Sequence, residues 1–236
     1  MFYTGHLLKE TDPYDHLIGF SKRRKTMQYI EDLNVLSNFE NVKNYLYMEC
    51  RPIDDPIIKE RNLAFTQCGD IAITYNICLE RKDNFLKGVM ITNEILDKYG
   101  ITVEKLHQYA AQTASAILEP VCEPVDHPVF ADIFMHVTSK CNVDGASVMF
   151  YYDFLPDLSE KLGKNLFVVP LSVNDFMVCA DDGIVDPSDL ECSLLRSNDN
   201  RDQDDFLSDS IYYYDYLDHS LFQIEIGGEE PVSHLN

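Results

Sequence analysis

One stretch, Ile71–Leu79, constrains the fold more than any other because its apolar side chains recur at every second position. A period of two is that of an extended strand, in which successive side chains point to opposite faces. The pattern predicts a β-strand, and we expect Gly88–Thr92 to pair with it across the polar turn Glu80–Asn84. The stretch is far shorter than the roughly 20 residues that cross a bilayer. The side chains expected on one face are those of Ile71, Ile73, Tyr75, Ile77 and Leu79.

Helical spacing flanks this strand on both sides. Residues 21–46 carry apolar side chains at helical intervals, and a short strand is expected at Tyr45–Cys50. Asn93 is expected to cap a short helix that ends near Gly100, because glycine readily takes the left-handed conformation found at helix ends. Thr102 is expected to cap a longer amphipathic helix that runs to about Leu118.

Three prolines, Pro120, Pro124 and Pro128, then rule out a continuing helix and predict a linker. We therefore expect an N-terminal α+β part over residues 1–119 and a C-terminal α+β part over residues 129–226. Residues 227–236, which contain two glycines and a proline, are expected to be a frayed tail. One continuous domain is the alternative.

The second half combines further strands and helices. Expected strands are Ile133–Thr138, Ala146–Tyr152, Leu166–Val169 and Phe176–Ala180; expected helices are Phe154–Leu162 and Pro187–Arg196. Ile211–Tyr216 and Leu221–Ile226 predict a closing hairpin that buries Tyr212, Tyr214 and Tyr216 and exposes Tyr213. Clustered strands with interspersed helices favour an α+β fold. We expect a mixed, mainly antiparallel sheet or sheets, with helices packed on one face and the option of two subdomains.

The charge is strongly and unevenly negative. Forty acidic residues against 19 basic ones give a net charge of −21, and residues 181–236 hold 15 acidic residues against Arg196 and Arg201, a net −13. Phosphate contacts need Lys and Arg, which are scarce here, so we expect no direct binding to nucleic acids. For the same reason we expect no binding to an anionic membrane. The one basic cluster is Lys22–Lys25, which we interpret as the solvent-exposed side of the first turn of a helix.

The cysteines indicate the compartment. Seven is an odd number without paired spacing, whereas secreted disulfide frameworks usually hold an even number. We therefore expect reduced, buried thiols in a cytoplasmic protein, and the N-terminus shows no apolar signal core.

The acidic segment from Asn198 to Asp205 is the main candidate for binding. As a calcium loop it fails at Gln203, where the sharp turn needs glycine, and it lacks the bidentate Glu. A solvated loop that contacts a basic protein is the interpretation that we keep. The candidate partner-binding residues are Asp199, Asp202, Asp204 and Asp205.

Catalytic signals are weak. Asp181-Asp182-Gly183 is a turn signal, although paired carboxylates can also hold Mg²⁺ or act as acid and base. Cys122 with His127, and His136 with Cys141, are close in sequence only. The chain has no phosphate-binding glycine loop and no nucleophile or zinc motif. We therefore assign no catalytic, cofactor-binding or metal residues and expect no cofactor.

Three segments stand out together: Val89–Leu106, Leu162–Gly183 and Leu207–Tyr216. They resemble an uncharacterised bacterial family, domain-of-unknown-function family 5688. Their order along the chain matches that family, and the likeness runs from about Val42 to Tyr216. The chain has Pro170-Leu171-Ser172 where the family pattern has Pro-Ser-Ser, and its lead-in is shorter. The resemblance implies a bacterial, cytoplasmic protein and transfers no catalytic residues.

Several functions stay open at this point. We expect a non-enzymatic binding or accessory protein that uses its acidic C-terminal surface. One alternative is an enzyme whose site assembles from scattered residues. Its only candidate site residues are Asp181, Asp182 and His136. Another is a mimic of DNA that inhibits a nucleic-acid enzyme. The closing hairpin could also supply an edge strand for oligomerisation, and the sequence leaves the oligomeric state open.

Overall fold

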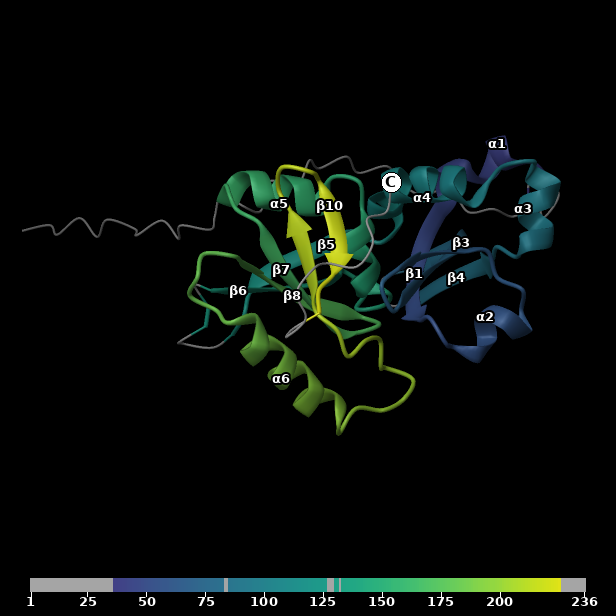
Figure 1. Ribbon diagram of the computed structural model, residues 1–236. Coiled ribbons are helices and arrows are strands. Elements are labelled where there is room, and N and C mark those ends of the chain that lie inside the picture. The colour runs from purple at the N-terminus through teal and green to yellow at the C-terminus, as the bar shows by residue number, and fades with distance from the viewer. Residues whose placement is uncertain (1–35, 83–84, 127–129, 132, 226–236) are drawn as a thin grey trace, which may run out of the picture.

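Two antiparallel sheets lie side by side in the computed structural model, which describes residues 36–82, 85–126, 130–131 and 133–225 (Figure 1). Every strand pair in this part of the chain is antiparallel. The α+β prediction with mainly antiparallel sheets is therefore confirmed. No helix among these residues is long and apolar enough to cross a membrane.

The first sheet is built around β3 (Ile71–Lys82), which pairs with all three other strands. The predicted strand is confirmed, but all residues from Ile71 to Cys78 are buried, so both of its faces are covered. The polar side chain of Thr74 is tolerated inside because its hydroxyl donates to the carbonyl of Glu49 at 3.1 Å. The other strands are β1 (Leu46–Pro52), β2 (Phe65–Cys68) and β4 (Phe85–Met90).

The longest helix of the described residues, α4 (Val103–Ile117), covers this sheet and buries its apolar stripe. Thr102 caps it as predicted, accepting a hydrogen bond from the backbone N–H of Lys105. The cap of α3 (Asn93–Tyr99) is Thr92 and not Asn93, one residue earlier than predicted. Gly100 ends α3 at φ 64°, which is the left-handed conformation expected there. The shorter helices are α1 (Phe39–Val42), η2 (Lys43–Tyr45) and α2 (Pro56–Glu60).

The second sheet has the strand order β10-β9-β7-β8-β6-β5. Its edge strand β5 (Pro120–Pro124) corrects the prediction of a linker at these two prolines. Prolines are tolerated at an edge, where no further strand needs their missing N–H groups. Pro128 lies outside the described residues. The remaining strands are β6 (Phe134–Ser139), β7 (Leu166–Ser172), β8 (Asp175–Ala180), β9 (Tyr212–Asp215) and β10 (Ser220–Gln223).

Helices cover both faces of this sheet, whereas one face was expected. Side chains of α5 (Phe154–Leu162) join the large core together with Leu166 and Val168 of β7. The helix α6 (Pro187–Asn198) packs with Phe167 and Val169, which are the alternate residues of the same strand. Because alternate residues point to opposite faces, α5 and α6 lie on opposite sides, as Figure 1 shows.

The predicted strand at Ala146–Tyr152 is wrong, because residues Gly145–Phe150 form the 3₁₀ helix η3. A Cβ on Gly145 would lie 2.1 Å from the carbonyl oxygen of Asn174, so only glycine allows this close approach. Residues 145–149 are all buried. The segment is apolar because it fills the space between the sheets, and not because it pairs in one.

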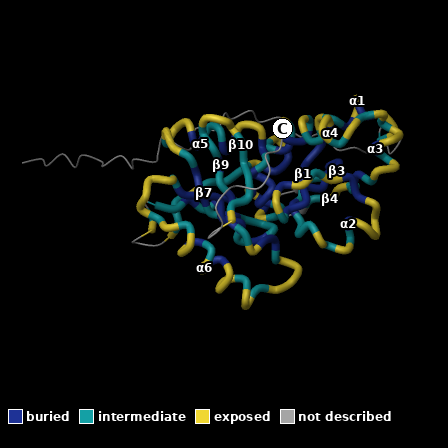
Figure 2. The backbone as a smooth tube through the Cα atoms, in the orientation of Figure 1, coloured by how far each residue is buried: buried dark blue, intermediate teal, exposed yellow. Residues whose placement is uncertain are grey.

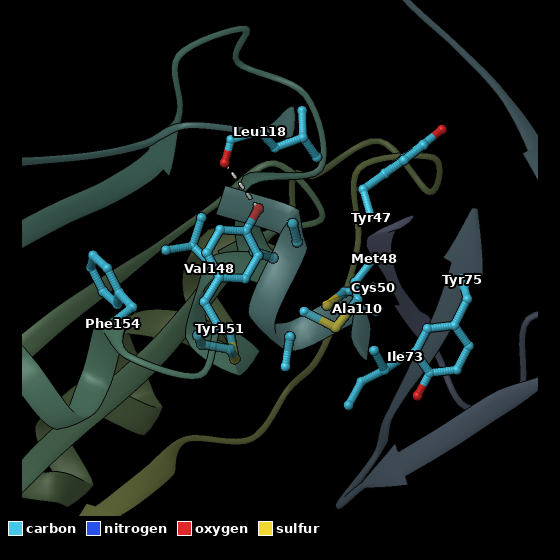
Figure 3. Close-up of a cluster of buried hydrophobic side chains, with 14 of the residues drawn as sticks. Tyr47, Met48, Cys50, Ile73, Tyr75, Ala110, Leu118, Val148, Tyr151 and Phe154 are labelled. Atoms are coloured by element: carbon cyan, nitrogen blue, oxygen red, sulfur yellow. Dashed lines mark hydrogen bonds between the residues drawn. The ribbon is translucent and has the colours of Figure 1, made fainter. Parts of the chain in front are cut away.

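One hydrophobic cluster runs through both sheets, and the central strands β3 and β7 are buried over most of their length (Figure 2). Its middle holds Tyr151, which is 3% exposed and donates a hydrogen bond to the carbonyl of Leu118 at 3.1 Å (Figure 3). The bond joins the end of η3 to the end of α4, and with it the second sheet to the first.

Several other predictions are confirmed. The helix over Phe154–Leu162 has those bounds, and Gly163 ends it at φ 64°. The closing hairpin forms from β9 and β10, and Tyr212 and Tyr214 are buried as predicted. The prediction is wrong for the other two tyrosines, because Tyr213 and Tyr216 are both half-buried. Most of the helix expected over residues 21–46, the basic cluster Lys22–Lys25 and the tail 227–236 lie outside the described residues.

Candidate partner-binding face

The acidic segment follows helix α6, which lies on the outer side of the second sheet. Asp186 caps the helix by accepting a hydrogen bond from the N–H of Ser188 at 2.8 Å, and Pro187 occupies the first turn. Leu190 and Leu194 are buried against the sheet. The remaining side of the helix is largely exposed (Figure 2).

The acidic loop, residues 198–205, follows α6 and has a backbone fixed by several hydrogen bonds. The N–H of Asp199 donates to the carbonyl of Leu195 at 3.0 Å, and that of Asp205 donates to the carbonyl of Asp202 at 3.0 Å. The carbonyl of Asp205 accepts from the N–H of Val173, in the turn between β7 and β8. The loop is therefore bonded to α6 at its start and to the turn between β7 and β8 at its end.

The four predicted binding residues, Asp199, Asp202, Asp204 and Asp205, are all exposed on this loop. In the described part of the chain, none of them forms an ion pair with a basic side chain. The nearby Arg201 turns its guanidinium back onto Asn198 and the hydroxyl of Ser197, at 3.1 and 3.0 Å. The negative charges of the loop therefore face solvent without neutralisation from this arginine.

A partly buried hydrogen-bond network, here called the Asp70 clasp, fixes the chain beyond the acidic loop. It consists of Asp70, Ser208, Ser210 and Tyr212. Ser208 donates to both carboxylate oxygens of Asp70 at 2.8 and 3.0 Å, Ser210 donates to one of them at 3.1 Å, and Tyr212 also donates to this carboxylate. The Nδ2 of Asn198, at the start of the loop, donates to the carbonyl of Ser208 at 2.9 Å. The clasp thus anchors the loop to the turn between β2 and β3.

Sequence reasoning did not find the clasp. Ser208, Ser210 and Tyr212 lie in the segment Leu207–Tyr216, which was recognised as a family likeness without a role. The signal that could have found it is the pair of hydroxyl residues two apart before a buried strand, since such groups need a polar partner when buried. Nothing in the sequence pointed to Asp70 as that partner.

The nominated His136 forms a polar cluster on the same face of the sheet as α6. Its Nε2–H donates to the Oδ2 of Asp175 at 2.8 Å, and this hydrogen bond raises the pKa of His136 while partial burial opposes the rise. Burial would raise the pKa of Asp175, but hydrogen bonds with His136 and Ser172 lower it. Both effects favour a charged pair.

This cluster does not have the geometry of nucleophilic catalysis. Ser172 donates its hydroxyl hydrogen to Asp175, whereas an activated serine donates to the histidine. Cys141, the sequence neighbour considered for His136, is buried, and His136 pairs with Asp175 instead. His127, considered with Cys122, lies outside the described residues.

Asp181 and Asp182 follow β8 and contact different partners. Asp181 accepts a hydrogen bond from the hydroxyl of Tyr213 at 2.6 Å, whose pKa burial and this bond raise to about 12. Asp182 lies 3.5 Å from the Nζ of Lys164, a partner that the local sequence did not indicate. Among the described residues, no group of three His, Cys, Asp or Glu side chains is placed to hold a metal ion.

The cysteines are free thiols, but not all of them are buried as expected. Five are buried, Cys122 is half-buried and Cys192 is exposed on α6. Cys192 is exposed because it lies on the side of the helix away from Leu190 and Leu194, which face the sheet.

Comparison with known proteins gives one family. The model of the family of unknown function (DUF5688) matches residues 14–136 and 130–216. No curated protein and no solved structure matches the chain. The matched residues cover most of the chain, including every strand except β10, the acidic loop and the Asp70 clasp. The chain therefore belongs to the DUF5688 family.

Proposed function

We propose that the protein is a non-enzymatic binding protein whose acidic loop docks onto a basic surface of a partner protein. The observation that carries the proposal is the state of Asp199, Asp202, Asp204 and Asp205. Their side chains are exposed and have no ion-pair partner in the described chain, while the backbone beneath them is held by hydrogen bonds.

Two physical effects support binding by such a loop. Its negative field attracts a positively charged partner from a distance and speeds association. A backbone that is already fixed loses little conformational entropy when the partner binds, so more of the contact energy remains as affinity. The flanking residues reinforce the field, because residues 181–236 carry a net charge of −13.

We further propose that the protein acts in a bacterial cytoplasm. Its seven free cysteines support this location, because reduced thiols persist in the cytosol and not in oxidising compartments. The family likeness stated above supports the bacterial origin.

The test is a tagged pull-down from a lysate of the source organism, read by mass spectrometry. The native chain is compared with a loop variant in which the four aspartates are changed to asparagine. A control variant removes the same charge at exposed positions away from the loop: Asp54→Asn, Glu60→Gln, Asp97→Asn and Glu160→Gln.

The proposal expects a basic protein that the native chain and the control variant retain and that the loop variant loses. A partner retained equally by all three proteins would show that binding occurs elsewhere. Loss from both variants would show only a general effect of net charge, and it would count against the loop as the site.

A further inference from the structure

A cavity of about 200 Å³ lies between the C-terminal end of α5 and strands β6 and β8. It is on the face of the second sheet opposite α6, so it is separate from the acidic loop. Its walls come from three elements and from the turn after β8. The lining residues that matter here are Met135, Leu158, Val178, Cys179, Lys164 and Ile184.

The walls of this cavity are apolar. Met135, Leu158 and Val178 belong to the buried core, each with 8% or less of its surface exposed. Leu162 of α5 completes the apolar wall, whereas the Cys179 side chain packs on the α6 side of the sheet. An apolar cavity of about 150 Å³ is large enough to bind benzene. This cavity therefore has room for a short hydrocarbon chain.

Two oppositely charged residues, Asp182 and Lys164, lie at the mouth of the cavity and differ in their hydrogen bonds. The Oδ1 of Asp182 accepts a hydrogen bond from the N–H of Ile184 at 3.1 Å, which holds this carboxylate in the turn. The Nζ of Lys164 lies 3.5 Å from the Oδ2 of Asp182, longer than a strong charge-assisted hydrogen bond. An ammonium group has three donors. Lys164 is half-exposed, so it can turn a donor towards an anion at the mouth.

We propose that this cavity binds a short aliphatic carboxylate. The hydrocarbon chain fills the space between Met135, Leu158 and Val178, and the carboxylate accepts hydrogen bonds from Lys164. Ile184, which is 68% exposed at the mouth, covers the part of the chain nearest to solvent. An anion fits better than a cation because the backbone already donates to the Asp182 carboxylate, whereas the Lys164 ammonium forms no hydrogen bond within the described part of the chain. No covalent step is involved.

The test uses sodium hexanoate and the full chain with ¹³C-labelled methionine methyl groups, followed by NMR. Met135 lines the cavity, whereas Met177 points to the opposite face of the same sheet and serves as an internal control. The proposal expects a saturable shift of the Met135 methyl signal and no matching shift of Met177. Hexanol and hexylammonium, which have the same chain and a different head group, are titrated beside it.

Two variants separate the charge from the cavity. Lys164→Met keeps the length of the side chain and removes the ammonium, and we expect it to weaken hexanoate binding roughly tenfold or more. Lys140→Met removes the same charge at another exposed site and is expected to leave binding unchanged. Neither residue is in the core, so both variants are expected to fold.

Absence of a saturable Met135 shift would overturn the site. Equal binding of hexanol or hexylammonium, or unchanged hexanoate binding in Lys164→Met, would overturn recognition of the carboxylate. Because the pull-down tests a different face, these results are independent of the proposed function.

Discussion

Ser208 donates its hydroxyl hydrogen to both carboxylate oxygens of Asp70, although 138 residues separate the two in the chain. Asp70 lies in the turn between β2 and β3, directly after Gly69, whose φ is 57°. Ser208 is only 2% exposed, so its hydroxyl has this carboxylate as its main partner inside the protein. The contact joins the two sheets and fixes the chain at the end of the acidic loop.

We predict that Asp70→Ala destabilises the protein by about 2–4 kcal/mol. The change removes an acceptor of three hydroxyl groups: Tyr212 keeps the carbonyl of Cys68 as a partner, whereas the buried Ser208 loses its main one. A buried polar group left unpaired costs about 1–3 kcal/mol. Urea unfolding measures the effect. Asp54→Ala changes an exposed aspartate in the turn between β1 and α2; it is the control and should change stability by less than about 0.5 kcal/mol. Equal free energies of unfolding of the two variants would show that the clasp does not stabilise the fold.

Tyr151→Phe should cost about 1–2 kcal/mol, because it leaves the carbonyl of Leu118 without its buried donor. The neighbouring residue supplies a matched control: Tyr152 is 70% exposed, and Tyr152→Phe should be nearly neutral. Thermal or urea unfolding of both variants measures the difference. If the two substitutions had the same effect, the hydrogen bond between η3 and α4 would contribute nothing.

Asp144→Asn should raise the free energy of unfolding relative to the native chain, and this difference should grow as the pH rises. Asp144 precedes η3, and burial, together with the charge of Glu49, raises the pKa of its carboxyl group to about 8, against the opposing effect of Arg51. The folded pKa exceeds the ordinary value, so the native chain loses stability as the pH rises from about 4 to about 8. Asparagine remains neutral and tolerates the φ of 52° at this position.

The measurement is the free energy of unfolding of both chains at pH 5 and pH 8. The advantage of Asp144→Asn should grow by about 1 kcal/mol or more between these values. Other groups titrate in both chains and cancel in the difference. Parallel pH dependence of the two chains would mean that Asp144 ionises normally in the folded protein.

His136 should titrate above the ordinary range of a histidine, because its hydrogen bond to Asp175 favours the charged ring. The stabilisation from this pair is present at low pH and is lost as the pH rises through the raised pKa. NMR titration of the ring signals measures this pKa, and Asp175→Asn should lower it. His107 is the contrast, since burial lowers its pKa and Asp175→Asn should not affect it. An unchanged His136 titration in the variant would exclude Asp175 as the cause.

The local elements of the fold were largely predictable from the sequence. The strand from Ile71, the helix from Phe154 and the closing hairpin each combine a clear hydrophobic period with end signals, such as Gly163 after the helix. These features depend on residues close together in the chain, and local sequence is enough to specify them.

The failures of prediction come from tertiary contacts. Residues Ala146–Tyr152 have strand-like composition, but the approach of Gly145 to Asn174 places them in a 3₁₀ turn between the sheets. Pro120 and Pro124 indicated a linker because the sequence does not show that their strand lies at an edge. The Asp70 clasp was missed for the same reason, since its partners meet only in the folded chain.

The central claim is that the acidic loop binds a basic partner through charge, and salt dependence tests it most directly. The affinity of the captured partner is measured for the native chain, the loop variant and the charge-matched control between about 0.05 and 0.5 M salt. Over this range the Debye length falls from above 10 Å to below it, so contacts between exposed charges weaken. We predict that affinity falls steeply with salt for the native chain and the control, and that the loop variant binds weakly and nearly independently of salt. Equal affinity and equal salt dependence of all three proteins would contradict the account.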